Sequence, residues 1–207
     1  MPDQIQVRFL KKFKVLILKF LKRNYRFIIV TGGGSFARNY ITAAAKVSRI
    51  NNEDKDWLGI YATRINAHLL RTIFKKEAYP VVLDSPQKPI DSKNYRLFIA
   101  SGWRPGSSTD YVAVLLARRF KADKFINASN ITHIYDKDKN PIKKISWPAY
   151  RRLIGSEWRP GMNVPFDPIA AKTAQKFKMK IIVAKGTDLK NLEKILTEKR
   201  FQGTIIH

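Results

Sequence analysis

Short apolar runs alternate with segments of helical periodicity along most of this chain, and this alternation limits its possible folds more than any other feature. The runs are rich in β-branched residues, and we expect them to form buried strands at residues 26–31, 79–83, 95–100, 124–128, 180–184 and 204–206. Helical spacing of apolar residues occurs in residues 8–23, 35–48, 56–75, 110–119, 147–154, 168–177 and 189–196. Strands that alternate with helices are typical of a mostly parallel sheet covered on both faces. The sequence therefore predicts an α/β protein, a three-layer α/β/α sandwich.

The chain is long enough to build a packed core of its own. Its 207 residues fit one domain with two lobes, so we expect a single domain over residues 1–207. Hydrophobic residues make up 44% of the sequence and charged residues 27%, which is close to ordinary globular usage. This composition argues against a disordered chain and against a fibrous repeat.

Basic residues greatly outnumber acidic ones. There are 40 Lys and Arg against 16 Asp and Glu, which gives a formal net charge of +24. Such a charge favours polyanionic partners, because the partner releases counterions on binding. One interpretation is a surface that binds nucleic acid, and the other is a set of solvated basic faces. The lysines are spread along the chain and are not interleaved with aromatic residues, which favours the second interpretation.

The sequence lacks the residues for a disulfide framework or a thiolate zinc site. It has no cysteine, and its three histidines, His68, His133 and His207, are far apart in the chain, so we expect no metal site built from them. The apolar stretch 15–18 has a lysine on either side and is far shorter than the ~20 residues of a membrane-spanning helix. We therefore expect a cytoplasmic protein without a membrane partner.

Residues 8–23 form a basic amphipathic pattern. A helix of this kind can lie on a membrane surface or cover one face of a sheet. The strand expected at residues 26–31 follows directly, which favours the second role.

Three loops that follow predicted strands carry residues suited to binding phosphate. In a parallel sheet such loops gather at the carboxyl edge, beside the amino ends of helices. In the first loop, Thr31–Arg38, three consecutive glycines leave backbone N–H groups open to an anion, and Arg38 can bind a phosphate through two parallel hydrogen bonds. A tight strand-to-helix turn also needs glycine for steric reasons alone, so both interpretations stay open for this loop.

The second loop, residues 102–109, carries one arginine, two serines and one threonine just before a helix. Its hydroxyl and N–H groups suit a phosphate or a base edge, and Ser108 or Thr109 can also act as the helix N-cap. Asp56 precedes a helix elsewhere in the chain, where it either caps that helix or binds ribose hydroxyls.

The third loop follows the strand at residues 124–128. Tyr135 in this loop can stack on an adenine, or the loop can be an ordinary polar connection. None of the three loops places a nucleophile beside a base. Their residues offer positioning and charge stabilisation, which are the needs of phosphoryl transfer.

Five segments carry motifs in a fixed order along the chain. They are residues 29–38 (IVTGGGSFAR), 56–67 (DWLGIYATRINA), 102–110 (GWRPGSSTD), 128–138 and 165–172 (PFDPIAAK). Taken together, they resemble the archaeal-type UMP kinases of the amino acid kinase family. The resemblance runs from about Phe9 to the end of the chain and implies a carbamate kinase-like fold.

The resemblance implies an enzyme that transfers the γ-phosphoryl group of ATP to UMP, giving UDP for pyrimidine nucleotide biosynthesis, with Mg²⁺ between the phosphates. It divides the domain into a UMP-binding half, residues 1–119, and an ATP-binding half, residues 120–207, with two ATP-binding residues contributed by the first half. The residues implied to surround UMP are Gly33, Asp56, Trp103, Arg104, Pro105, Gly106, Ser107, Ser108 and Thr109. Those implied to surround ATP are Gly34, Arg38, Ser129, Asn130, Tyr135 and Asp138, with Arg38 also acting in catalysis. It further implies a homo-oligomer, a hexamer as in relatives.

The chain differs from the family pattern in two places. Relatives begin with a strand and a Gly-Gly-Ser type loop that holds the transferred phosphoryl group, whereas Met1-Pro2-Asp3 begins where that loop has already passed into the first helix. Relatives also usually have Asp-Gly where this chain has Thr132-His133. Losing one set of phosphate donors typically costs ~100- to 1,000-fold in rate, so a chain without this loop would be a poor kinase. We therefore expect the natural gene to start further upstream and to encode the missing strand and loop. The alternatives are an inactive homologue and a basic nucleic-acid-binding protein on the same fold.

Overall fold

Two parallel strands, β1 (Phe27–Val30) and β2 (Leu97–Ala100), form the sheet of the first of two units into which the chain divides, Met1–Leu116 and Ala117–His207. The computed structural model describes residues 4–155 and 164–207, so the Met1-Pro2-Asp3 segment lies outside the described residues. Phe27 pairs with Leu97 and Val30 with Ala100. Both strands are apolar throughout instead of alternating, as expected where helices cover both faces of a sheet.

The strand predicted at residues 79–83 is reduced to two isolated bridges. Ala78 pairs with Leu97 and Leu83 with Ala100, while the residues between them form no continuous ladder. Pro80 explains the difference, because proline has no N–H to donate to a neighbouring strand. The prediction of a full strand was therefore wrong, although the segment does run beside β2.

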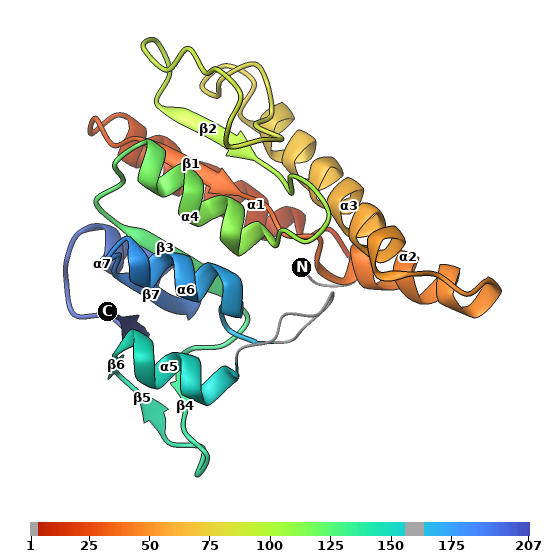
Figure 1. Cartoon of the computed structure of the whole chain (residues 1–207). Coiled ribbons are helices and arrows are strands. Elements are labelled where there is room, and N and C mark those ends of the chain that lie inside the picture. The colour runs from red at the N-terminus through yellow and green to blue at the C-terminus, as the bar shows by residue number, and fades with distance from the viewer. Residues whose placement is uncertain (1–3, 156–163) are drawn as a thin grey trace. The chain divides into compact units, whose positions relative to one another are not determined.

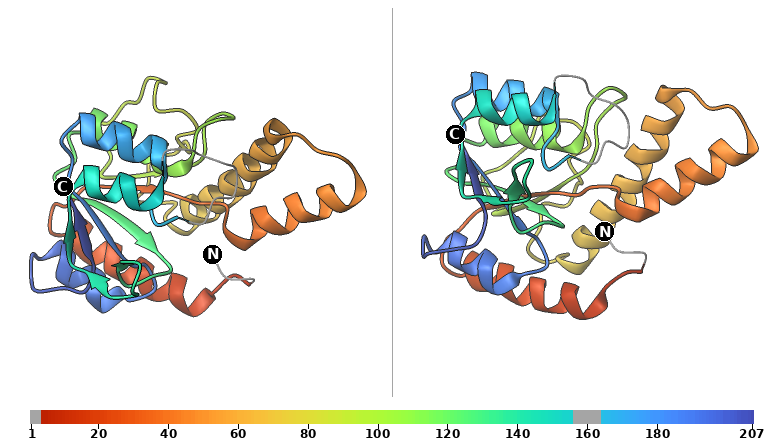
Figure 2. Two further views of the ribbon diagram at one scale, coloured as in Figure 1. Left: turned by 60° about the horizontal axis from the view of Figure 1, so that its bottom comes forward. Right: turned by 90° about the horizontal axis from the view of Figure 1, so that it is seen from below.

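Helices surround the sheet of the first unit. They are α1 (Val7–Leu21), α2 (Gly34–Val47), α3 (Asn52–Ile73) and α4 (Thr109–Arg119), the last of which crosses the unit boundary. In Figure 2, α1 lies on one face of the sheet and α4 on the other. The helices α2 and α3 pack against each other, and α3 also packs against β2. The end of the pair where the two helices are joined projects away from the strands (Figure 1).

The amphipathic pattern of α1 serves the core. Its apolar residues Leu16, Ile17 and Phe20 are buried, and Ile17 belongs to a cluster that also contains Phe74 of the segment after α3 and Leu97 of β2. The predicted role as a sheet-covering helix is therefore confirmed. Lys14 adds a polar link, because its Nζ donates to the carbonyl of Ile73 at 2.7 Å, where the carboxyl end of α3 leaves carbonyls unpaired.

The amino end of α3 is fixed by a reciprocal cap. The Asn51 side chain accepts from the N–H of Asp54 at 2.8 Å, and the Asp54 carboxylate accepts from the N–H of Asn51 at 3.2 Å. The helix therefore begins four positions before the predicted start. Asp56 lies inside the helix, so the interpretation of Asp56 as a cap was wrong.

The second unit contains a four-stranded sheet in the order β3-β7-β8-β6. Its strands are β3 (Phe125–Ser129), β6 (Lys144–Ile145), β7 (Ile181–Lys185) and β8 (Thr204–Ile206). The pairs β3–β7 and β6–β8 are parallel, whereas β7–β8 is antiparallel. Figure 2 shows α5 (Trp147–Ile154) and α6 (Pro168–Lys176) on one face of this sheet and α7 (Leu189–Leu196) on the other.

A small antiparallel ribbon, β4 (Ile134–Tyr135) with β5 (Pro141–Ile142), was not predicted from the sequence. Two-residue strands are too short to give a periodic pattern. The ribbon is held by a distant residue, since the Oγ1 of Thr204 accepts from the N–H of Ile134 at 2.8 Å and donates to the carbonyl of Ile142.

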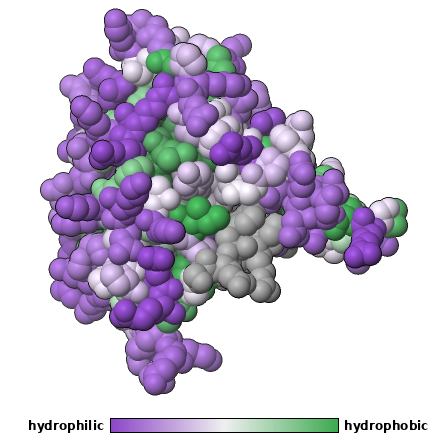
Figure 3. All heavy atoms as spheres, in the orientation of Figure 1, coloured by the Kyte–Doolittle hydropathy of each residue, from purple (hydrophilic) through white to green (hydrophobic). Residues whose placement is uncertain are grey.

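Hydrophilic residues dominate the face of the molecule shown in Figure 3, in keeping with the excess of lysine and arginine. Within residues 4–155 and 164–207, none of the helices is both long enough and apolar enough to cross a membrane.

Candidate functional site

The first glycine loop connects β1 to α2, and each of two glycines meets a distinct requirement. Gly34 begins α2 with φ of +63°, a left-handed conformation that favours glycine. A Cβ on Gly33 would lie only 2.6 Å from the Cβ of Ala37. Gly32, by contrast, has open space around it. The loop therefore combines two sterically required glycines with an open stretch of backbone that a ligand can approach.

The amino end of α2 carries no opposing acid. Its first turn has no acidic residue, so the positive end of the helix dipole is not neutralised locally. Arg38 is exposed one turn further on, and no ion pair or hydrogen bond of its side chain is present among the described residues. The loop and helix thus present N–H groups and one arginine that an anion can bind.

The second loop runs from the end of β2 to α4. The N–H of Gly102 donates to Thr63 Oγ1 at 2.8 Å, and the N–H of Gly106 donates to the Asp56 carboxylate at 2.7 Å. Asp56 thus acts as an anchor for this loop. Gly106 has φ of +74°, which favours glycine at the turn.

Arg104 stands at the tip of the second loop. Its guanidinium lies over the ring of Trp103, 4.0 Å from the ring centre, and the side chain is exposed. The stacking holds the planar group without occupying its N–H donors, so these can still bind a carboxylate or a phosphate.

The end of the loop forms the cap of α4. Ser108 Oγ accepts from the N–H of Tyr111 at 3.0 Å, which confirms the predicted capping role of Ser108. Thr109 is the first residue of the helix. The N–H of Ser107 donates to the carbonyl of Arg104 at 3.1 Å and closes the turn between them.

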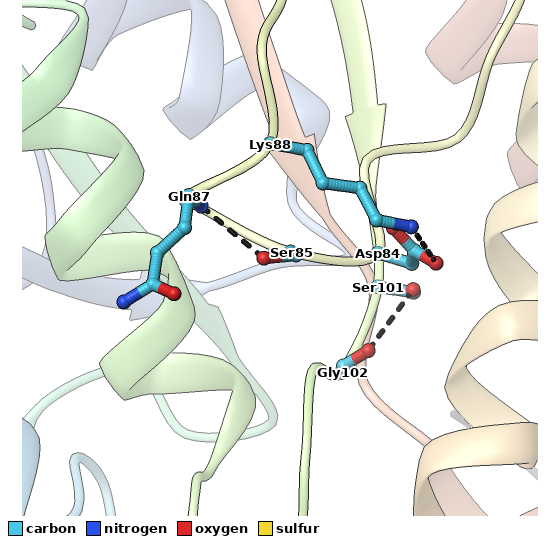
Figure 4. Close-up of polar contacts among 6 residues, drawn as sticks. All are labelled: Asp84, Ser85, Gln87, Lys88, Ser101 and Gly102. Atoms are coloured by element: carbon cyan, nitrogen blue, oxygen red, sulfur yellow. Dashed lines mark hydrogen bonds and ion pairs between the residues drawn. The ribbon is translucent and has the colours of Figure 1, made fainter.

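A third segment reaches the same edge of the first unit, although the sequence marked it only as a proline-containing loop. The N–H of Ser101 donates to the carbonyl of Leu83 at 3.0 Å, which places the residues after Leu83 beside the end of β2. Figure 4 shows this neighbourhood, including the ion pair between Lys88 and Asp84 at 2.9 Å. Ser101 is fully buried, and its hydroxyl donates to the carbonyl of Gly102 at 3.2 Å.

In the second unit, Ser129 ends β3 and is tied into the sheet. Its carbonyl accepts from the N–H of Gly186 at 2.7 Å, and its hydroxyl approaches the Asn130 side-chain oxygen at 3.4 Å. Asn130 is exposed. A Cβ on Gly186 would lie 3.0 Å from the Cβ of Ala128, so the end of β7 needs a glycine to pack closely against β3.

Tyr135 is 40% exposed, and its hydroxyl is 2.8 Å from Thr132 Oγ1. The preceding histidine anchors the segment, because His133 Nε2 accepts from the N–H of Gly203 at 3.1 Å. The histidine thus stabilises the loop by a bond to a segment 70 positions away in the sequence.

Two aspartates near Tyr135 behave differently. Asp136 folds the following turn, since its carboxylate accepts from the N–H groups of Asp138 and Asn140 at 2.9 and 2.8 Å. Asp138 is exposed at the surface of the turn. Of the two, Asp138 is therefore the carboxylate that solvent or a ligand can reach.

The electrostatic features of the two units are otherwise simple. No group of three or more His, Asp or Glu side chains in the described ranges 4–155 and 164–207 is placed to bind a metal ion. In the second unit, Lys124 forms an ion pair with Glu198 at 2.7 Å, and this hydrogen bond and charge lower the pKa of the exposed Glu198 carboxyl.

The sequence pattern of the amino acid kinase family matches residues 7–185. The chain belongs to this family. Curated relatives include the uridylate kinase of Thermoplasma volcanium, 37% identical and aligned over 95% of this chain and 88% of that protein. The uridylate kinase of Thermococcus sibiricus is 32% identical over 99% of this chain and 93% of its own length.

Solved structures agree with this family membership. The uridylate kinase of Archaeoglobus fulgidus has a TM-score of 0.82 at 31% identity, over 98% of this chain and 94% of that one. The UMP kinase of Bacillus anthracis, at 20% identity, supports the fold alone, with a TM-score of 0.77 over 99% of this chain and 88% of that one. The predicted α/β/α kinase fold is thereby confirmed.

Within the first unit, the structure brings together two of the loops that were predicted to bind phosphate, residues 31–38 and residues 102–109. Both loops are hydrogen-bonded to α3. Asp56 and Thr63 accept from N–H groups of the loop after β2, and the Asn66 side chain donates to the Gly32 carbonyl of the loop after β1. Thr63 and Asn66 were not among the predicted site residues. Their position could have indicated a role, since they are polar residues on the face of α3 that also carries the core residues Ile60 and Ala67. A polar residue on a buried face does not, however, show which distant segment it contacts.

Proposed function

We propose that this protein is a uridylate kinase that transfers the γ-phosphoryl group of ATP to UMP, giving UDP for pyrimidine nucleotide biosynthesis. One observation in the structure carries the proposal. Two glycine loops at the carboxyl ends of adjacent parallel strands are tied to a single helix, with the exposed Arg104 at one loop and the exposed Arg38 beside the other. Such an arrangement grips phosphates through backbone N–H groups and guanidinium groups.

The first unit supplies the UMP side in this proposal. The residues in contact with UMP are Gly33, Asp56 and the segment from Trp103 to Thr109. The turn that Asp56 holds through Gly106 presents Arg104 to the nucleotide phosphate. Names of relatives support the choice of acceptor, since those at 31% to 37% identity include several uridylate kinases.

ATP contacts Gly34, Arg38, Ser129, Asn130, Tyr135 and Asp138, and the Arg38 guanidinium stabilises the charge on the transferred phosphoryl group. Tyr135 is exposed enough to stack on a base. Mg²⁺ commonly binds through substrate phosphates and water with only one or two carboxylates, so the proposal needs no cage of protein ligands.

We further propose a cytoplasmic homo-oligomer in which a second copy covers α3. The helix exposes three large apolar residues in one row, Trp57, Tyr61 and Ile65. Its first turn holds Glu53 and Asp54, and its last turn holds Arg71. Two antiparallel copies of this helix would therefore match apolar rows and place opposite charges together, as a two-fold interface requires.

The direct test measures ADP release with UMP, CMP and other acceptors, in the presence of ATP and Mg²⁺. We expect UMP to be the preferred acceptor. The same assay on a chain extended upstream tests whether an additional phosphate loop raises the rate, by ~100- to 1,000-fold if that loop is functional. Equal and negligible ADP release with every acceptor in both chains would contradict the proposed function.

A further inference from the structure

One face of α3 carries polar residues that are buried although they lie in a helix lined by core residues. Thr63 and Asn66 are exposed by only 5% and 8%, next to Ile60 and Ala67, which belong to the core. Buried polar groups persist where they are hydrogen-bonded, and here each of the two side chains has a partner in a loop of the proposed nucleotide site.

Thr63 fixes the second loop. Its hydroxyl donates to the carbonyl of Ile60 at 2.6 Å, so its proton is already used within the helix. The oxygen therefore faces the N–H of Gly102 as an acceptor, at 2.8 Å. Contact is close, because a Cβ on Gly102 would lie 3.0 Å from the same oxygen. Asp56, two turns earlier on the helix, holds Gly106 of this loop.

Asn66 fixes the first loop from the same turn of helix. Its Nδ2 donates to the carbonyl of Gly32 at 2.8 Å. The Thr31 hydroxyl adds a bond in the other direction, donating to the backbone carbonyl of Thr63 at 2.9 Å. A single rigid turn of α3 thus touches the segments that follow both β1 and β2.

We propose that Thr63 and Asn66 are positioning residues that set the spacing between the loop at residues 31–34 and the loop at residues 102–106. This inference rests on the proposed uridylate kinase function, because the two loops form its phosphate contacts. Neither side chain acts on the reacting atoms. Their role is to hold backbone N–H groups and Arg104 in place before the nucleotide arrives, which lowers the cost of ordering the loops on binding.

The test compares Thr63→Val, which keeps the shape but lacks the hydroxyl, with Thr63→Ser, which retains it. Losing a buried acceptor should raise KM for UMP about 10-fold in Thr63→Val with a much smaller change in kcat, whereas Thr63→Ser should stay within about 2-fold of the parent protein. Thr72→Val is the matched control, since Thr72 is exposed on the same helix. Asn66→Ala provides an independent variant, expected to raise KM for both nucleotides.

A second readout does not depend on turnover. Hydrogen exchange of the amides of residues 102–104 and 106, measured without nucleotide, should be faster in Thr63→Val than in Thr63→Ser or Thr72→Val. If the parent protein does not phosphorylate UMP, the proposed function fails while this exchange comparison still decides the positioning role. The proposal is overturned if Thr63→Val and Thr63→Ser share the same defect, or if melting temperature falls while KM and loop exchange stay unchanged.

Discussion

At the scale of single residues, Gly32 and Gly34 of the first loop differ in whether the backbone conformation requires glycine. Gly34 has φ of +63°, while Gly32 has open space around it and no such φ. Gly34→Ala should lower the free energy of unfolding by about 1–2 kcal/mol, because an L-residue is strained in the left-handed region. Gly32→Ala is the control and should change it by less than about 1 kcal/mol. Urea denaturation followed by tryptophan fluorescence measures both, and equal losses would show that the φ of Gly34 is not the cause.

At the scale of elements, the capping box decides where α3 begins. Asn51→Ala removes the acceptor for the Asp54 N–H and should destabilise the protein by about 1 kcal/mol. Asn52→Ala, at the adjacent exposed position inside the helix, should have little effect. Thermal unfolding followed by circular dichroism measures the stability of both variants. A larger loss of stability in Asn52→Ala than in Asn51→Ala would show that Asn51 is not the cap.

Elements with a clear period or a local cap could be predicted from the sequence, as the bounds of α5 and α7 show. What the sequence did not reveal depends on partners far along the chain. The bond between His133 and Gly203 spans 70 positions, and the bond between Asn66 and Gly32 spans 34. The glycine loops and the Ser108 cap were predictable because their chemistry is local. The anchors Thr63 and Asn66 became apparent only once α3 was folded against the strands.

At the scale of the whole molecule, the proposed association through α3 can be tested with one charge. Tyr61 is 56% exposed in the middle of the apolar row, so Tyr61→Glu should separate the copies by burying an unpaired carboxylate. Ile169→Glu, on an apolar residue that is 39% exposed on α6, is the control and should leave the assembly intact. Light scattering coupled to gel filtration gives the mass of each species. A parent protein that elutes as a monomer would disprove the association.

The helix α3 has two working faces, an inner one that holds the loops and an outer one with the apolar row. Any displacement of this rigid rod moves both faces together. In the proposed oligomer, the contact between copies and the affinity for nucleotide are therefore coupled. By reciprocity, a nucleotide that favours one placement of α3 strengthens the contact between copies by the same factor. In the proposed oligomer, dilution below the dissociation constant of the contact between copies would weaken substrate binding without any change in the amino acids that touch the substrate.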